Sequence, residues 1–497
     1  MSFSKRQLIF GILVITIYLS FLLDRAPRVS TNEPWESIPA YQLAFKGTLN
    51  NPVLSGLEFL DQHFLGPQVI QPIILGAFYR IFGLTLFNGR LVSLIMALGT
   101  LWILFRLFEF ERLEKFFIAT GLILLASDNF FYYYARFIRA EIFVTFFGLL
   151  SFYFLYKAIV TKRTAMFMPA GFFTGVCALS HPAASIMAVS LYIILIYEYR
   201  LTVFRSTQFW IFAVFTSLAL LPFLVYLFYQ DWSNGFSHFW AQMAKHATQS
   251  SDGFWIHTFL AEWERYRKYA LFPYRIPIVI SQLIFLIYAF RIKDRLARFS
   301  LIVVLSHMIL LTFLITTRNP RYFLPALPFL SIVILKTIRH LRLDSVKSFF
   351  TGYSSKSLHQ KIGAVSFVIL MGIQIPGNPG LMMAERSANY DDLIKTLRSE
   401  IPAGCRVVGP MTFWLGFSDC TYRTEETYEF ANVDSCLHDL KPDYVITHTM
   451  YLWKRDKVKW SSIAETIDRF VKNNYRVIKK IDNKTYGPIM IWKSQQK

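Results

Sequence analysis

The stretch Arg28-Val29-Ser30-Thr31-Asn32-Glu33-Pro34-Trp35-Glu36-Ser37 directly follows the first apolar segment of the chain, Leu8 to Leu23. It places an amide, two carboxylates and a tryptophan close together at one face of a membrane. An ordinary polar loop with an interfacial tryptophan anchor has the same composition, so the stretch alone does not separate a structural from a functional role. The arrangement of the rest of the chain decides between the two.

Repeated apolar runs of about 16–22 residues follow this stretch and indicate a polytopic membrane protein. Of the 497 residues, 54% are hydrophobic and only 17% are charged. The net charge of +20 could indicate a nucleic-acid-binding protein, but the basic residues fall mostly in short clusters between apolar runs. That placement favours a membrane protein and no nucleic acid as partner. The four cysteines include no CxxC pair, so a zinc site is not expected.

The positive-inside rule assigns a side of the membrane to each loop. With Lys5-Arg6 inside, the first apolar run is interpreted as a retained signal-anchor helix, which brings residues 28–37 to the outer face. The stretch Gly66 to Gly83 is predicted to lie at the outer interface as an amphipathic or re-entrant helix, because the basic residues after the next run would otherwise face outside. The remaining alternation predicts about eleven transmembrane helices, with the N-terminus inside and the C-terminus outside.

The composition changes at Pro376-Gly377-Asn378-Pro379-Gly380, which reads as a linker. Residues 1–377 are therefore predicted to form the transmembrane domain and residues 378–497 a small α/β domain outside the cytoplasm. Helical periodicity covers Asp391 to Glu400. Residues 406–409 and 444–447 are predicted to form short buried strands, and residues 475–481 and 489–492 are predicted to form further strands.

The hydrophilic residues with chemistry typical of a site fall on the predicted outer side. The positive-inside rule predicts few arginines there, yet the outer turns contain Arg136, Arg139, Arg318 and Arg321. A planar guanidinium group binds phosphate or carboxylate with two parallel hydrogen bonds. Three explanations remain open: an anion site, for instance for a lipid-linked phosphate; structural pairing with outer carboxylates; and contact with lipid headgroups.

Three further residues are candidates beside these arginines. Tyr322 stands at the start of a helix, where a phosphate contact is favoured over an anchor at the interface. His63 precedes the predicted interfacial helix, where a donor phosphate would pass. Glu141 could act as a metal ligand, orient Arg136, or form an ion pair with a neighbouring arginine at a helix start.

The order of these motifs resembles that of the GT-C membrane glycosyltransferases. The most similar branch contains the protein O-mannosyltransferases and the bacterial lipid A aminoarabinose transferase, that is, glycosyltransferase family 39 and its relatives. Asn32-Glu33-Pro34-Trp35 resembles the acidic motif of the family's first outer loop, and Ala135-Arg136-Phe137-Ile138-Arg139-Ala140-Glu141 resembles its Arg-then-acid turn. Ser180-His181-Pro182 and the stretch from Arg321 to Pro328 are similar to further family stretches. The individual motifs are short, and the resemblance covers about residues 1–340.

The resemblance implies transfer of a sugar from a polyprenyl-phosphate-linked donor to a lipid, glycan or protein acceptor. A carboxylate would take the proton of the acceptor hydroxyl, and a single displacement would invert the anomeric centre. Arginines, with or without a divalent cation such as Mg²⁺ or Mn²⁺, would stabilise the leaving phosphate. We expect a bacterial inner-membrane protein whose active site and C-terminal domain face the periplasm.

Asn32 departs from the family pattern, in which an aspartate at this position is the general base. An amide cannot accept the proton, so three interpretations remain open. Glu33 or Glu36 accepts it, the acceptor is acidic enough to need little help from a base, or the protein is inactive and only binds. Asn32, Glu33 and Glu36 are therefore the candidate catalytic residues.

Two rival functions remain beside the enzyme. One is a transporter or flippase for a lipid-linked glycan, and the other is a non-catalytic glycan-assembly scaffold with the same fold. A transporter should carry ionisable residues in the middle of its spans and show internal repeats. The sequence has few mid-span charges and no evident repeat, so the enzyme is favoured.

Overall fold

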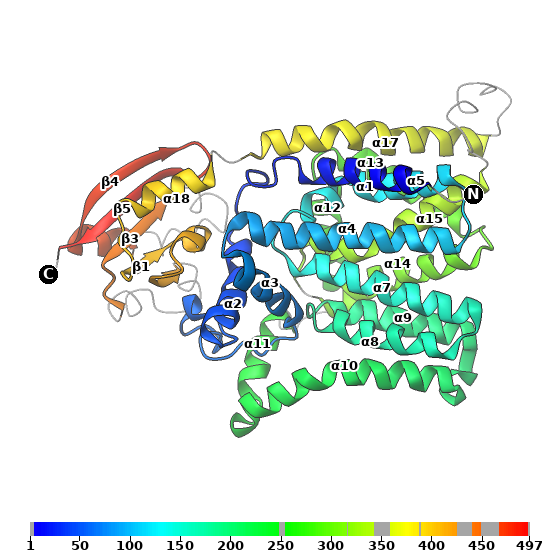
Figure 1. Cartoon of the computed structure of the whole chain (residues 1–497), viewed down its shortest axis with the longest axis horizontal. Coiled ribbons are helices and arrows are strands. Elements are labelled where there is room, and N and C mark those ends of the chain that lie inside the picture. The colour runs from blue at the N-terminus through cyan, green and yellow to red at the C-terminus, as the bar shows by residue number, and fades with distance from the viewer. Residues whose placement is uncertain are drawn as a thin grey trace.

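The computed structural model describes residues 4–247, 254–315, 317–341, 358–386, 389–424, 440–448 and 467–495. Most of these residues form a bundle whose long helices run side by side, and a small sheet domain stands at one end of it (Figure 1). The N-terminus lies at the opposite end of the bundle, and the C-terminus lies at the far edge of the sheet domain (Figure 1). The predicted class, a polytopic helical protein with a small C-terminal α/β domain, is confirmed.

The bundle and its end contain α1 (Lys5–Ser20), α2 (Asn32–Lys46), α3 (Ile70–Phe82), α4 (Leu86–Phe110), α5 (Lys115–Ser127), α6 (Asn129–Tyr134), α7 (Ala140–Thr161), α8 (Phe167–Ala178), α9 (Ala184–Tyr199), α10 (Thr207–Asp231), α11 (Ser237–Ala247), α12 (Phe254–Ala270), α13 (Arg275–Ala289), α14 (Arg295–Leu314), α15 (Leu327–His340) and α17 (Leu358–Ala384). Within the described residues, seven helices are long and apolar enough to cross a membrane, or eight if the bent pair α12–α13 is one span. Four shorter apolar helices occur at Ile9–Ser20, Ile70–Phe82, Lys115–Ser127 and Thr164–Ala178. The number of about eleven spans and the N-in/C-out orientation stay predictions.

The stretch after the first apolar segment forms the helix α2, where the sequence predicts a polar loop. Its two prolines argue against a helix when only the sequence is considered. Pro34, however, lies in the first turn, where a missing N–H removes no intrahelical hydrogen bond. Glu33 in the same turn complements the positive end of the helix dipole. Gly47 ends the helix in the left-handed conformation, and its N–H donates to the carbonyl of Gln42.

Helix α3 packs closely against α2 and confirms the helix predicted within residues 66–83. Gly76 allows the contact, because a Cβ atom at this position would lie 2.7 Å from the carbonyl oxygen of Ala40. The position of α3 at the membrane interface stays a prediction.

Two further predictions of irregular structure, a long polar loop at about 231–272 and a linker at 376–380, are wrong. The polar segment between α10 and α13 consists largely of the helices α11 and α12. The Pro/Gly stretch 376–380 lies inside α17, which continues to Ala384. The side chain of Asn378 supports the helix there, because it donates to the carbonyl of Ser127 and to the hydroxyl of Tyr18, both at 2.8 Å. The division of the chain at 377/378 stays a prediction.

The sheet domain contains α18 (Tyr390–Arg398) and the strands β1 (Arg406–Gly409), β2 (Thr421–Thr424), β3 (Tyr444–His448), β4 (Tyr475–Asn483) and β5 (Gly487–Ser494). The strand order is β2-β1-β3-β5-β4. Strand β1 pairs parallel with β2 and β3, whereas β5 pairs antiparallel with β3 and β4. All four predicted strands are present, and β2 is an additional one.

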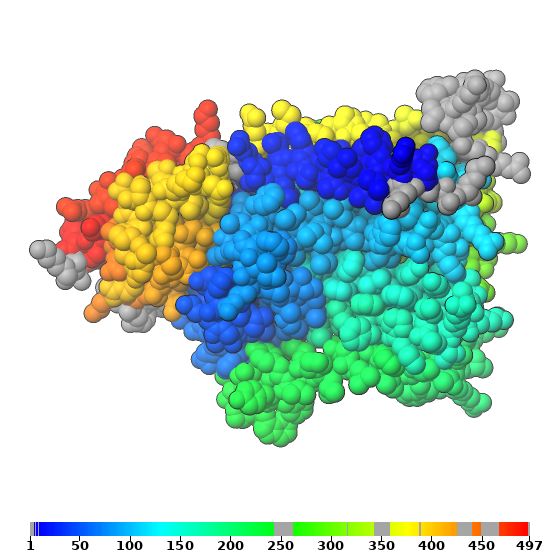
Figure 2. Space-filling view, viewed as in Figure 1, coloured from blue at the N-terminus to red at the C-terminus, as the bar shows by residue number. Residues whose placement is uncertain are grey.

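The sheet domain packs against the end of the bundle that carries α2 (Figure 2). Trp414 makes an edge contact with Tyr41 of α2, with ring centroids 5.7 Å apart. The hydroxyl of Tyr486 donates to the carbonyl of Val29 at 3.3 Å, just before α2. The stretch that separates the first apolar segment from the rest therefore lies between the bundle and the sheet domain.

Candidate active site

Helix α2 carries two carboxylates, Glu33 and Glu36, which lie on the same face because they are three residues apart. Their exposed fractions are 0% and 4%, so both are buried. A buried carboxylate needs polar partners to offset its loss of hydration. The two side chains find these partners in different networks.

Glu33 forms an ion pair with Arg90 of α4. The guanidinium binds both carboxylate oxygens, with Nε at 2.8 Å from Oε1 and Nη2 at 2.9 Å from Oε2. Arg90 is itself fully buried and also donates to the carbonyls of Leu23 and Pro27, at 3.0 and 2.6 Å. This network ties α4 to α2 and to the connection between α1 and α2.

Glu36 belongs to a second network, which we call the Glu36 cluster: Glu36, Gln68, Arg139, Glu141 and Arg321. Gln68 donates from Nε2 to Glu36 Oε2, and Arg139 Nη1 lies 3.5 Å from Glu36 Oε1. Arg139 also binds both oxygens of Glu141, at 3.0 and 2.8 Å. Arg321 Nε lies 2.7 Å from the same Glu141 carboxylate. Glu141 thus orients two guanidinium groups beside Glu36.

Four segments that are separate in the sequence supply this cluster, and one of them carries both Arg139 and Glu141. Glu36 comes from α2, Gln68 from the segment before α3, Arg139 from the turn before α7, Glu141 from the first turn of α7, and Arg321 from the 3₁₀ helix η5 (Pro320–Ala326). All of them belong to the bundle, and α2 and α3 lie at its end next to the sheet domain (Figure 1).

Burial raises the pKa of Glu36 to about 7, and the nearby Glu141 carboxylate acts in the same direction. Arg139, Arg321 and the hydrogen bond from Gln68 oppose the rise. A carboxyl group with a pKa near neutrality can accept a proton and release it again at physiological pH. Arg321 has the more accessible guanidinium, since its side chain is 17% exposed and that of Arg139 only 5%.

Tyr322 packs beside the cluster. Its ring centroid lies 5.4 Å from that of His181 and also 5.4 Å from the guanidinium carbon of Arg321. The Tyr322 carbonyl accepts a hydrogen bond from His307 Nε2 at 2.8 Å, which fixes the backbone of η5.

The structure does not bring Arg136 or Arg318 into the Glu36 cluster. Arg136 is fully buried and donates to the hydroxyl of Tyr132 at 2.9 Å and to the carbonyl of Phe21. Arg318 pairs at 2.9 Å with Glu262 of α12. Both arginines have protein partners of their own, and a role for either in binding a donor phosphate stays a prediction.

The other two candidates are Asn32 and His63. Among the described residues, the structure records no contact between either side chain and the Glu36 cluster. Asn32 is half-buried as the first residue of α2. His63 is half-buried in the segment before α3, and its carbonyl accepts a hydrogen bond from Gln242 at 2.8 Å. Their predicted roles remain to be tested by substitution.

The sequence reading missed Arg90 and Gln68. A signal for Arg90 was present, because an ionisable residue inside an apolar run of membrane length normally faces the protein interior and a partner there. Gln68 carried no such signal, because a glutamine before a helix is common.

Glu141 does not fit the tentative role of metal ligand. Both of its oxygens face guanidinium groups of Arg139 and Arg321. Across the described ranges, no group of three or more His, Cys, Asp or Glu side chains could hold a metal ion. The donor set around Glu141 therefore does not suit a divalent cation.

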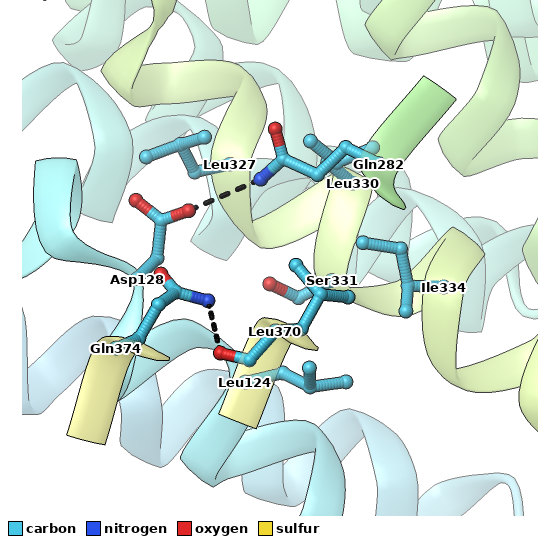
Figure 3. Close-up of a pocket in the computed structure, with 9 residues that line it drawn as sticks. All are labelled: Leu124, Asp128, Gln282, Leu327, Leu330, Ser331, Ile334, Leu370 and Gln374. Carbon is cyan, nitrogen blue, oxygen red and sulfur yellow. Dashed lines mark hydrogen bonds between the residues drawn. The ribbon is translucent and has the colours of Figure 1, made fainter. Parts of the chain in front are cut away.

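A separate cavity lies inside the bundle between α5, α13, α15 and α17 (Figure 3). Three of its polar lining residues, Asp128, Gln282 and Gln374, form hydrogen bonds within the protein. Gln282 Nε2 donates to Asp128 Oδ2 at 3.2 Å, and Arg275 binds the same carboxylate at 2.8 and 3.0 Å. Gln374 Nε2 donates to the carbonyl of Leu370 at 2.8 Å (Figure 3). We interpret this network as a structural contact that attaches the bent α12–α13 pair to the start of α6.

Comparison with known proteins finds similarity to membrane glycosyltransferases. Residues 69–226 match the model of the dolichyl-phosphate-mannose-protein mannosyltransferase family. None of the curated proteins matches the sequence.

Solved structures of such enzymes have the same fold. ArnT from Cupriavidus metallidurans, bound to undecaprenyl phosphate, is similar over 98% of both chains, with 10% identity and a TM-score of 0.62. The oligosaccharyltransferase of Archaeoglobus fulgidus is similar over 99% of this chain and 75% of its own, with 11% identity and a TM-score of 0.57. The arabinofuranosyltransferase AftD from Mycobacteria covers 100% of this chain with 40% of its own, at 12% identity and a TM-score of 0.53. The chain therefore has the fold of the GT-C membrane glycosyltransferases.

Proposed function

We propose that the chain transfers a sugar from a polyprenyl-phosphate-linked donor to an acceptor at the extracytoplasmic face of a bacterial inner membrane. The observation that carries the proposal is the Glu36 cluster, in which a carboxyl group with a pKa near 7 lies beside two oriented arginines. The family match and the fold support the same chemistry, as does the undecaprenyl phosphate bound to the similar ArnT.

The proposed reaction is a single displacement. The acceptor hydroxyl attacks the anomeric carbon, the bond from that carbon to the phosphate oxygen breaks, and the configuration inverts. Glu36 takes the proton of the attacking hydroxyl. Arg139 and Arg321 stabilise the negative charge on the leaving polyprenyl phosphate. Glu141 holds the two guanidinium groups in place for this task.

Glu36 is the better candidate for the base than Glu33. Arg90 engages both oxygens of Glu33 in a fully buried pair, so a proton on Glu33 would leave the guanidinium without its counter-charge. Glu36 has a looser contact with its arginine, 3.5 Å, and a pKa suited to proton transfer.

Transfer from radiolabelled polyprenyl-phosphate sugars tests the proposal directly, in membranes with and without the chain. Radiolabel in a product of inverted anomeric configuration, formed only when the chain is present, would support it. Folded protein that transfers none of a broad set of donors to a broad set of acceptors would contradict it and favour the scaffold or the transporter.

Asn32→Asp tests whether the departure from the family motif is compatible with catalysis. Asn32 precedes Glu36 by one helical turn, so a new carboxylate there could share or perturb proton transfer. We expect kcat to change by at least about tenfold, and by no more than the roughly 10²–10⁴-fold that general base catalysis contributes. Asn234→Asp, at an exposed position after α10, is the matched control and should leave kcat unchanged. A scaffold would show no transfer with either variant.

Arg321→Lys tests the proposed contact with the donor phosphate. Lysine keeps the charge but loses the planar fork, so we expect the donor KM to rise by about tenfold and kcat to fall less. Arg318→Lys, three residues earlier, serves as the comparison because its guanidinium pairs with Glu262 instead of the Glu36 cluster. A larger rise in donor KM for Arg318→Lys than for Arg321→Lys would contradict the prediction and indicate that the donor phosphate binds Arg318, next to Glu262.

A further inference from the structure

Helix α11 holds the segment that leads to Gln68 of the Glu36 cluster. Gln242 of α11 is only 6% exposed, and its side-chain amide makes three hydrogen bonds to the backbone of this segment. Nε2 donates to the carbonyls of Glu58 and His63, at 3.2 and 2.8 Å. Oε1 accepts from the N–H of Leu65 at 2.9 Å. One side chain thereby fixes residues 58–65.

A second anchor fixes the segment on the other side of Gln68. The N–H groups of Val69 and Ile70 both donate to the carbonyl of Leu179, at 3.0 and 3.2 Å. Gln68 thus lies between an anchor at Leu65 and an anchor at Val69. The position of its backbone depends on both.

Helix α11 is itself attached to the protein at its first turn. Asp231 is fully buried, and its Oδ2 accepts a hydrogen bond from the N–H of Phe239 at 2.8 Å. His238 stacks on Phe59 of the same segment, with ring centroids 3.7 Å apart. The helix therefore acts as a support for residues 58–65.

We propose that Gln242 is a positioning residue for sugar transfer, which acts through the 58–65 segment and Gln68 on the alignment of the Glu36 carboxylate. The proposal rests on the proposed function, in which Glu36 accepts the acceptor proton. A contact that only stabilises the fold would affect the amount of folded protein, whereas a positioning contact also affects the chemistry of Glu36.

The test compares Gln242→Met, which has nearly the same volume but loses all three hydrogen bonds, with the wild-type chain. We expect kcat to fall by about tenfold with little change in donor KM, because a small misplacement of a base slows the chemical step more than binding. The midpoint of the kcat–pH profile should move to higher pH, since the hydrogen bond from Gln68 holds the pKa of Glu36 down. Gln242→Asn keeps the amide and carries the same test if Gln242→Met does not fold.

Gln62→Leu is the matched control, because Gln62 is an exposed glutamine in the same segment. It should leave kcat and the pH profile unchanged. The double variant Gln242→Met/Gln68→Leu separates positioning from general weakening. If Gln242 acts through Gln68, the substitution at position 242 should have almost no further effect on kcat once Gln68 is gone.

Two outcomes would overturn the inference alone. One is wild-type kcat and pH profile in a folded Gln242 variant, and the other is an equal loss of kcat in the presence and absence of Gln68. Failure of the wild-type chain to transfer sugar from any donor would overturn the proposed function and the inference together.

Discussion

Glu36→Gln is expected to lower kcat for sugar transfer by about 10²–10⁴-fold, the usual contribution of a general base. Glutamine has nearly the same shape, and its carbonyl oxygen can still accept a hydrogen bond from Gln68 or Arg139, so the local packing should survive. The amide cannot accept the proton of the acceptor hydroxyl. Single-turnover transfer from a radiolabelled donor, with donor binding measured separately, would separate the loss of chemistry from a loss of binding.

The pH dependence of wild-type kcat gives an independent check. Burial raises the pKa of Glu36 to about 7, against the opposing effects of Arg139 and Arg321 and together with the effect of Glu141. The base must be ionised to act, so kcat should fall as the pH drops below about 7 and level off above it. The residual activity of Glu36→Gln should lack this acid limb. The same limb in both proteins would assign it to another group.

Glu36→Gln should lower kcat but raise the stability of the folded protein at alkaline pH. The folded pKa of Glu36 lies above its ordinary value of 4.5, so the folded state binds the proton more tightly than the unfolded state. The stabilising contribution is then fully present below about pH 4.5 and is lost as the pH rises through about 7. Glu36→Gln should therefore raise Tm near about pH 8 but not near about pH 4.5. A lower Tm at the higher pH would show that Glu36 mainly serves as the ion-pair partner of Arg139.

The polar motifs in the sequence predict only some of the residues that meet in the Glu36 cluster. Four of the predicted residues do meet: Glu36, Arg139, Glu141 and Arg321. They do so although Glu36 and Arg321 lie near opposite ends of the bundle sequence. Arg136 lies three residues before Arg139 but points to the carbonyl of Phe21 instead. The two arginines stand in an irregular turn, where residue spacing does not determine the direction of a side chain as it does in a helix.

Two of the missed helices, α2 and α17, have a common physical cause. Both α2 and α17 contain prolines, which normally indicate a turn or a helix end. In α17 the neighbouring segments compensate, because Asn378 bonds to Ser127 and Tyr18 across the bundle. Such compensation depends on tertiary contacts between residues that are hundreds of positions apart, and local sequence cannot reveal it. Strands such as β1 and β3 were easier to predict, because they are short and rich in β-branched and apolar residues.

Arg90→Met is expected to destabilise the protein by about 3–5 kcal/mol, because it leaves the buried Glu33 carboxylate without its counter-charge. Two backbone carbonyls, those of Leu23 and Pro27, lose their donor as well. The thermal midpoint of the purified protein in detergent should fall clearly. Arg106→Met on the same helix is the matched control, since the Arg106–Glu109 pair is largely exposed and such pairs contribute about 0–1 kcal/mol.

Removing both charges should separate the structural role of this pair from catalysis. In Arg90→Met/Glu33→Leu no unpaired charge remains, and replacing a whole buried ion pair by apolar groups is often close to neutral. We therefore expect the double variant to recover much of the lost stability and to transfer sugar at a kcat within about tenfold of wild type. If Glu33 were the base, the double variant would be folded but inactive, by about the 10²–10⁴-fold expected for a lost general base. The comparison with Glu36→Gln thus decides which carboxylate of α2 has replaced the missing aspartate at Asn32.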